Sequence, residues 1–128
     1  MSATVQYWID ISDYDFDTAQ AMLKTGRYLY VGFMCHQVVE KILKAYFVHN
    51  KGDIPPYTHS LSYLCRITSL ESLLSTEQTG FLDELEPLNI QGRYPTYKEL
   101  IMKGLTPSTC KKIIQETNTF RQWVKAKL

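Results

Sequence analysis

The run from Tyr28 to Asn50 constrains the fold most, because its apolar residues recur with the period of a helix. They follow the spacing i, i+3, i+4 and are Val31, Met34, Cys35, Val38, Val39, Ile42, Leu43, Tyr46 and Phe47. This spacing predicts a long helix with one side against a core. Because the apolar pairs step by four residues, the apolar stripe turns by about 160° over four steps. The helix is therefore expected to touch more than one neighbour and to be the central helix of a bundle.

A first helix is predicted from about Val5 to Leu23, ending before Gly26. Glycine adopts the left-handed conformation that follows many helices at little cost, so Gly26 marks a tight turn. The short turn sends the central helix back antiparallel to the first.

Beyond the central helix, Pro55-Pro56 breaks the chain, and a short third helix is predicted over 61–68. Ser75 opens a fourth helix, with Gln78 at the capping-box spacing, and Pro87 ends or kinks it. The last helix begins near Pro107 and is capped by Thr106 or Ser108.

The segment 88–105 is expected to be largely irregular, with a short helical turn around 98–103. No strand pattern is convincing. The predicted fold class is all-α, an antiparallel up-and-down four- or five-helix bundle.

Composition favours a single helical domain over 1–128, since 128 residues with 45% hydrophobic content can bury a core. A net charge of +1 argues against binding duplex nucleic acid by charge alone. The charge is unevenly distributed along the chain. Aspartates gather on the first predicted helix, and the last carries the basic residues Lys111, Lys112, Arg121, Lys125 and Lys127. The simplest interpretation is that both are helix faces exposed to solvent. The clustered Asp10, Asp13 and Asp17 are likewise expected to be a solvated acidic face rather than a magnesium site.

Cys35, Cys65 and Cys110 show no paired spacing, so no disulfide framework or zinc knuckle is expected. The N-terminus does not resemble a signal peptide, and no apolar run is long enough to span a membrane. A cytoplasmic location is expected.

The densest polar cluster lies opposite the apolar stripe, at His36, Gln37, Glu40, Lys41 and Lys44. These residues fall within roughly 140° of one another on a helical projection. One interpretation is a solvated face with weak ion pairs; the other is a site in which lysines hold phosphate and Gln37 reads a base edge. His36 and Glu40 could ligate a metal, but His49 lies about 19 Å further along the axis, so neither metal nor cofactor is expected.

His59 precedes the third predicted helix. Its side chain is expected either to form a hydrogen bond at the start of that helix or to reach the polar side of the central helix. The segment 93–98 is the best candidate for ligand contact. The Arg93 guanidinium can donate two hydrogen bonds to a phosphate, and the ring of Tyr94 or Tyr97 can stack on a base. The alternative is that the tyrosines pack back against the bundle.

Several stretches, in this order, resemble the HEPN family of helical domains: Gly26-Arg27-Tyr28, Cys35 to Ala45, His59-Ser60-Leu61 with Leu64, and Arg93-Tyr94-Pro95. The most specific is Gln37-x-x-Glu40-Lys41-x-x-Lys44-Ala45 after the Gly26 turn. The resemblance implies a helical bundle, often a homodimer, that is frequently encoded beside a minimal nucleotidyltransferase. Some such proteins are proposed to bind nucleotides, and many are metal-independent RNases of toxin–antitoxin and defence systems.

Those RNases share an Arg-x(4–6)-His motif, and this sequence lacks it, since no histidine follows His59. Metal-free RNA cleavage needs a group that moves protons near neutral pH, usually histidine. The resemblance therefore implies a non-catalytic nucleotide- or RNA-binding or assembly module that acts with a nucleotidyltransferase-like partner. Its expected contacts are Gln37, Glu40, Lys41, His59, Arg93, Tyr94 and Tyr97. The alternative is a metal-independent RNase with a relocated proton donor such as His59 or Tyr97.

Overall fold

A computed structural model describes residues 2–90 and 94–128 of the chain. These residues form the long helices α1 (Ala3–Lys24), α2 (Tyr28–Lys51) and α6 (Pro107–Lys125), with the shorter α3 (Leu61–Ile67), α4 (Thr76–Leu85) and α5 (Pro95–Gly104) between them. Two short 3-10 turns, η1 (Leu70–Leu73) and η2 (Glu86–Leu88), flank α4. No strand occurs in the described ranges, so the predicted all-α helical bundle is confirmed.

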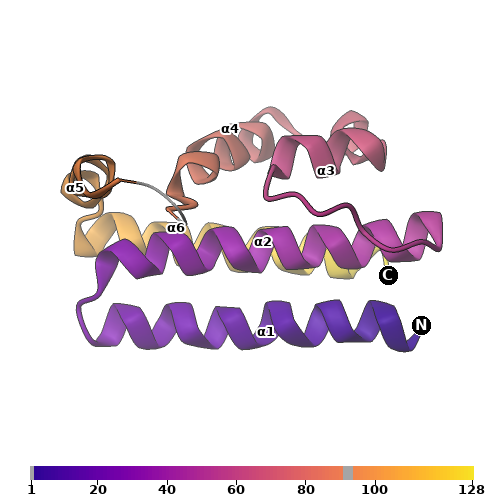
Figure 1. Cartoon of the computed structure of the whole chain (residues 1–128), viewed down its shortest axis with the longest axis horizontal. Coiled ribbons are helices and arrows are strands. Elements are labelled where there is room, and N and C mark those ends of the chain that lie inside the picture. The colour runs from indigo at the N-terminus through magenta and orange to yellow at the C-terminus, as the bar shows by residue number, and fades with distance from the viewer. Residues whose placement is uncertain (1, 91–93) are drawn as a thin grey trace.

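The central position predicted for α2 is confirmed, because α2 contacts α1, α3, α4, α5 and α6. In Figure 1, α1 lies along one side of α2 and antiparallel to it, while α6 runs beside α2 in the same direction. α3 and α4 cover another side, and α5 lies near the end of the bundle where α2 begins. The core therefore surrounds α2, and Val31, Val38 and Ile42 are completely buried.

Local sequence signals set the helix ends. Gly26 takes a positive φ of 74° after α1, as predicted for the turn. Ser75 and Gln78 form the predicted capping box at the start of α4. Thr106, rather than Ser108, caps α6, because its hydroxyl accepts from the Thr109 amide at 3.2 Å.

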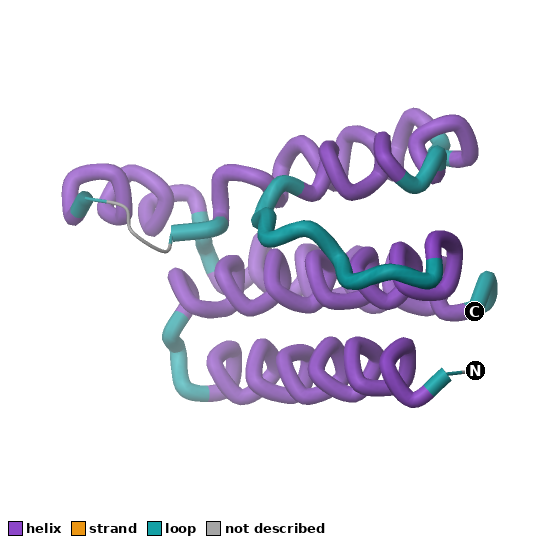
Figure 2. Tube along the Cα trace, turned by 45° about the vertical axis from the view of Figure 1, so that its right-hand side comes forward, coloured by secondary structure: helices purple, strands orange, loops and turns teal. Residues whose placement is uncertain are grey.

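The expectation for 88–105 is corrected, because most of this segment is the ten-residue helix α5. Pro95 stands at its first position, where the missing amide hydrogen costs nothing. No residue of α5 is buried, so the helix leaves little trace in the apolar pattern. The longest irregular stretch is instead the turn and loop over 52–60, which runs back along α2 before α3 begins (Figure 2).

Candidate functional site: a buried carboxylate that holds an exposed histidine

The candidate site forms where the loop over 52–60 passes the middle of α2. This loop, together with α1 and η2, covers the polar side of α2 that the sequence predicted opposite the apolar stripe. As a result Glu40 is only 1% exposed and His36 is not exposed at all. The interpretation of this side as a solvated face is therefore corrected: it is an internal polar layer.

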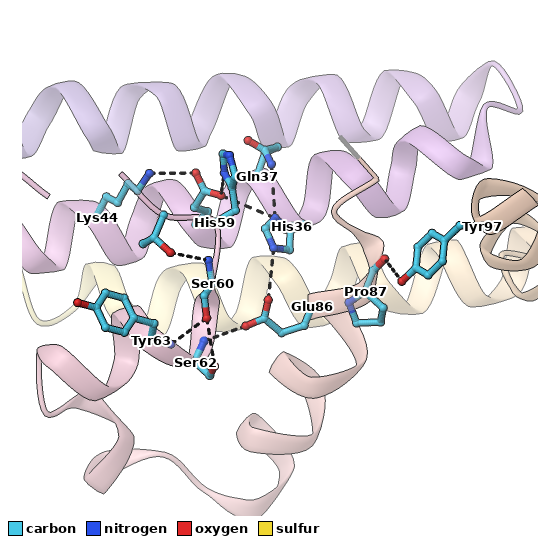
Figure 3. A network of polar contacts seen from close by, with 12 residues as sticks. His36, Gln37, Lys44, His59, Ser60, Ser62, Tyr63, Glu86, Pro87 and Tyr97 are labelled. Carbon is cyan, nitrogen blue, oxygen red and sulfur yellow. Dashed lines mark hydrogen bonds and ion pairs between the residues drawn. The ribbon is translucent and has the colours of Figure 1, made fainter. Parts of the chain in front are cut away.

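Glu40 is the centre of this layer, and Figure 3 labels two of its partners, His59 and Lys44. His59 Nδ1 donates to its Oε1 at 2.9 Å, and Lys44 Nζ donates to its Oε2 at 3.2 Å. Lys41 Nζ forms an ion pair with the same Oε2 at 3.6 Å. Burial raises the pKa of Glu40, but the His59 hydrogen bond and the charges of Lys41 and Lys44 outweigh it, so the pKa is lowered overall. The carboxylate is thus held ionised inside the protein.

A second chain of contacts orients the His36 ring. Lys41 Nζ donates to Gln37 Oε1 at 2.8 Å, so the amide nitrogen of Gln37 faces His36 Nδ1, at 3.4 Å. Because that amide nitrogen is a donor, Nδ1 accepts, and the ring proton of neutral His36 resides on Nε2. His36 Nε2 lies 3.8 Å from Glu86 Oε2, which is close enough for attraction but too long for a hydrogen bond.

Glu86 connects this layer to the start of α3. Its Oε1 accepts the Ser62 backbone amide at 2.9 Å, and its Oε2 faces His36. Burial raises the pKa of Glu86, but the His36 imidazole and the Ser62 amide outweigh it, and the pKa is lowered overall. The two carboxylates, Glu40 and Glu86, therefore lie on opposite sides of the His36 ring, one from α2 and one from η2.

Asp15 faces the layer from α1. Burial raises its pKa, and the negative charge of Glu40 adds to that effect while the charge of Lys41 opposes it.

His59 is the member of the layer that reaches the surface. Its side chain is 45% exposed, and its ring contacts Tyr57 edge to face, with centroids 6.3 Å apart. The buried Glu40 carboxylate holds Nδ1, which leaves Nε2 as the remaining hydrogen-bonding atom of a partly exposed ring. The geometry that the sequence offered as one possibility, a His59 nitrogen reaching the polar side of the central helix, is present. The chemical result is an imidazole with a fixed orientation at the protein surface.

The structure thus brings together Gln37, Glu40, Lys41 and His59, and it places the predicted tyrosines elsewhere. Tyr97, on α5, donates its hydroxyl to the Pro87 carbonyl at 3.3 Å (Figure 3). Tyr94 is 82% exposed at the start of α5. Arg93 lies outside the described residues.

Sequence reasoning missed Glu86 and Ser62 as members of this layer. Glu86 stands before Pro87, and nothing in its spacing relates it to His36, which lies far earlier in the chain. The one available signal was the turning apolar stripe of α2, which indicated that several sides of this helix are covered.

Within 2–90 and 94–128, no group of three or more His, Cys, Asp or Glu side chains is arranged to hold a metal ion. Over the same residues, no helix combines the length and apolar character needed to cross a membrane.

Comparisons with known proteins agree with this fold. None of the curated proteins matches the chain in sequence. The crystal structure of TT1696 from Thermus thermophilus superposes with a TM-score of 0.83 at 17% identity, covering 99% of this chain and 100% of that one. At this identity the likeness shows a shared fold. The family model of the HEPN domain matches residues 5–127. The chain therefore belongs to the HEPN domain family.

Proposed function

We propose that this chain is a non-catalytic HEPN module that binds a nucleotide or RNA and works with a nucleotidyltransferase-like partner. Family membership supports a role connected with nucleotides or RNA. The absence of an Arg-x(4–6)-His motif in the sequence supports the non-catalytic part, because family RNases use that motif.

The observation that carries the proposal is the Glu40–His59 pair. An imidazole held at Nδ1 by a buried carboxylate offers Nε2 as an acceptor to a ribose hydroxyl when the ring is neutral, or as a donor to a phosphate when the ring is protonated. Neither contact requires a flexible side chain to be ordered first. Glu40 and Gln37 are engaged within their own chain, so in this proposal they position other groups, and His59 makes the contact. Lys41, which is partly exposed, adds positive charge nearby.

Assembly is part of the same proposal. Tyr94 is exposed at the start of α5, and a second copy or a nucleotidyltransferase-like protein covering this end would place Tyr94 at a shared cleft. Tyr97 supports the cleft by fixing α5 to η2 through the Pro87 carbonyl. Light scattering of the purified chain tests for a homodimer, and co-purification from the native host tests for the nucleotidyltransferase. A chain that stays monomeric and carries no such partner removes the assembly part.

A second candidate, a metal-independent RNase, is favoured by the same pair. A carboxylate that orients an imidazole is the arrangement by which several enzymes prepare a general base. We rank it second because cleavage needs groups on both sides of the phosphate, and the other histidines do not adjoin His59 at the surface. His36 is completely buried, and His49 lies near the far end of α2.

One experiment separates the two. Labelled single-stranded RNA is incubated with the purified chain, binding is followed by fluorescence anisotropy, and RNA integrity is checked on a gel in the presence of EDTA. The matched variants are His59→Ala and His49→Ala, which each remove one histidine from the surface. The binding module predicts intact RNA and an affinity at least tenfold weaker in His59→Ala only.

Cleavage that survives EDTA and disappears in His59→Ala would replace the binding module with the RNase. Intact RNA and no measurable binding by the unmodified chain would contradict both candidates. Equal loss of affinity in the two histidine variants would show that the Glu40–His59 pair is not the contact.

A further inference from the structure

A cavity of about 370 Å³ lies where the end of α2 and the turn after it pass over the start of α1. No residue of this cavity was among the predicted contacts. Its lining consists of Thr4, Tyr7, Trp8, Val48, Gly52, Asp53, Ile54 and Pro55. The volume is in the range of small-molecule sites, which are typically concave and largely apolar with a few polar groups.

Two aromatic rings form one wall of the cavity. The Tyr7 and Trp8 rings meet edge to face, with centroids 5.5 Å apart. Ile54, on the opposite turn, is 83% exposed, so an apolar side chain stands in water beside the rings. A flat aromatic ligand between these residues would bury all three apolar surfaces, and nucleobases stack on tryptophan and tyrosine with about 1–3 kcal/mol per base.

Asp53 is the charged group of the cavity, and its carboxylate is already oriented. Its Oδ1 accepts the Ile54 amide at 2.7 Å, which orients the carboxylate and leaves Oδ2 and the second lone pair of Oδ1 as acceptors. A carboxylate repels phosphate, so the base of a nucleotide, rather than its phosphate, suits the cavity. Guanine presents two parallel N–H donors on one edge, adenine and cytosine present one amino group, and uracil has no amino group. The polar lining therefore favours guanine.

The cavity adjoins the candidate site in two ways. Pro55 precedes His59 by four residues on the same loop, which limits their separation to about 14 Å of extended chain. On the other side, Lys44 Nζ lies 5.5 Å from the Trp8 ring centroid and also donates to Glu40, which holds His59. A strand with one base in the cavity can therefore extend its backbone towards His59.

We propose that this cavity is a nucleobase pocket with a preference for guanine, serving either a free nucleotide or one residue of an RNA strand. The inference rests on the proposed function and names the part of the ligand that this end of the molecule recognises. A free nucleotide and an RNA strand would both present a base to the pocket. The two titrations described next distinguish these ligands.

Tryptophan fluorescence provides the test, because the chain has only two tryptophans, Trp8 and Trp123. In full-length Trp123→Phe protein, Trp8 is the sole tryptophan, and a base stacked on it quenches the emission that follows selective excitation of tryptophan. One arm titrates GMP, AMP, CMP and UMP, and the other titrates single-stranded RNA containing a single guanosine. The expected result is saturable quenching in at least one arm, strongest for guanine and weakest for uracil.

Two variants in the Trp123→Phe background connect the signal to the pocket. Tyr7→Ser removes one aromatic wall, and Tyr14→Ser removes an exposed tyrosine two turns further along the same helix as its control. Tyr7→Ser is expected to weaken binding about tenfold and Tyr14→Ser to leave it unchanged. Asp53→Asn keeps the acceptor for the Ile54 amide and is expected to reduce the preference for guanine over uracil about tenfold.

Failure of the pocket and failure of the proposed function give different results. If RNA binds by anisotropy while Trp8 emission is unchanged and Tyr7→Ser behaves like Tyr14→Ser, the pocket is refuted and the binding module stands. If no nucleotide or RNA binds by either measurement, both are refuted. If mononucleotides quench Trp8 emission but the RNA strand does not bind, the pocket is supported and its ligand is a free nucleotide rather than RNA.

Discussion

At the scale of single residues, the protein holds a glutamate where burial alone would favour its neutral form. Two hydrogen-bond donors, His59 and Lys44, and the nearby charge of Lys41 surround Glu40. Such a carboxylate stabilises the fold only while its partners compensate for lost hydration. This balance makes the residue sensitive to both substitution and pH.

We predict that Glu40→Gln lowers the free energy of unfolding at neutral pH by about 2–3 kcal/mol, because it leaves buried donors without their charged acceptor. The pKa of Glu40 is lowered by folding, so its contribution is complete above the ordinary glutamate range and is lost as pH falls through the lowered native value. Urea titrations should therefore show a difference in free energy of unfolding between wild type and Glu40→Gln that is smaller at acidic pH than at neutral pH. Glu84→Gln, on the exposed side of α4, is the control. An equal loss in both variants would contradict the account.

Asp15 should respond in the opposite direction. Burial raises its pKa, so the native state favours the neutral acid, and ionisation at neutral pH costs stability. Asp15→Asn is therefore expected to raise the free energy of unfolding at neutral pH by less than about 1 kcal/mol. The gain should vanish at a pH below the ordinary aspartate range, where wild-type Asp15 is also neutral. A loss of stability at neutral pH would show that the attraction to Lys41 dominates instead.

At the scale of helices, the sequence predicted the elements that carry periodicity or caps, and it predicted only a short turn of α5, which carries neither. α2 was recognisable because its buried side repeats, and α4 because Ser75 and Gln78 face each other across its first turn. α5 was not, since it buries no residue. The burial of Glu40 was not predicted, because no periodicity marks the irregular loop over 52–60 that brings His59 to it.

Gly32 of α2 packs closely against Leu88 and Leu105, and this contact predicts the effect of a larger side chain at position 32. A Cβ atom on Gly32 of α2 would lie 3.1 Å from Leu88 Cδ1 and 3.2 Å from Leu105 Cδ1, whereas one on Gly80 of α4 would meet nothing within 4 Å. Gly32→Val should therefore destabilise the protein by about 1–3 kcal/mol through overpacking. Gly80→Val should be close to neutral, because valine has a slightly better helix propensity than glycine. Thermal unfolding of the pair checks this; similar melting temperatures would refute the close contact.

At the scale of the whole molecule, the layers around α2 isolate reactive groups from water. Cys35, Cys65 and Cys110 are all buried and unpaired, and burial raises the pKa of Cys35 and of Cys65 to about 12. The thiolates that react with disulfide reagents are thus scarce in the native protein. We expect almost no labelling by a chromogenic disulfide under native conditions and three equivalents after unfolding. Rapid labelling of even one cysteine in the native state would contradict this packing.

The central claim is that a buried Glu40 holds His59 by its Nδ1 hydrogen at the surface of the bundle. Nitrogen-15 spectra of the imidazole rings, recorded where histidine is neutral, report which nitrogen carries the proton. We expect a protonated Nδ1 on His59 with slow hydrogen exchange, lost in Glu40→Gln, and no such signal from the exposed His49. A His59 ring that exchanges and tautomerises like His49 in the unmodified protein would contradict it.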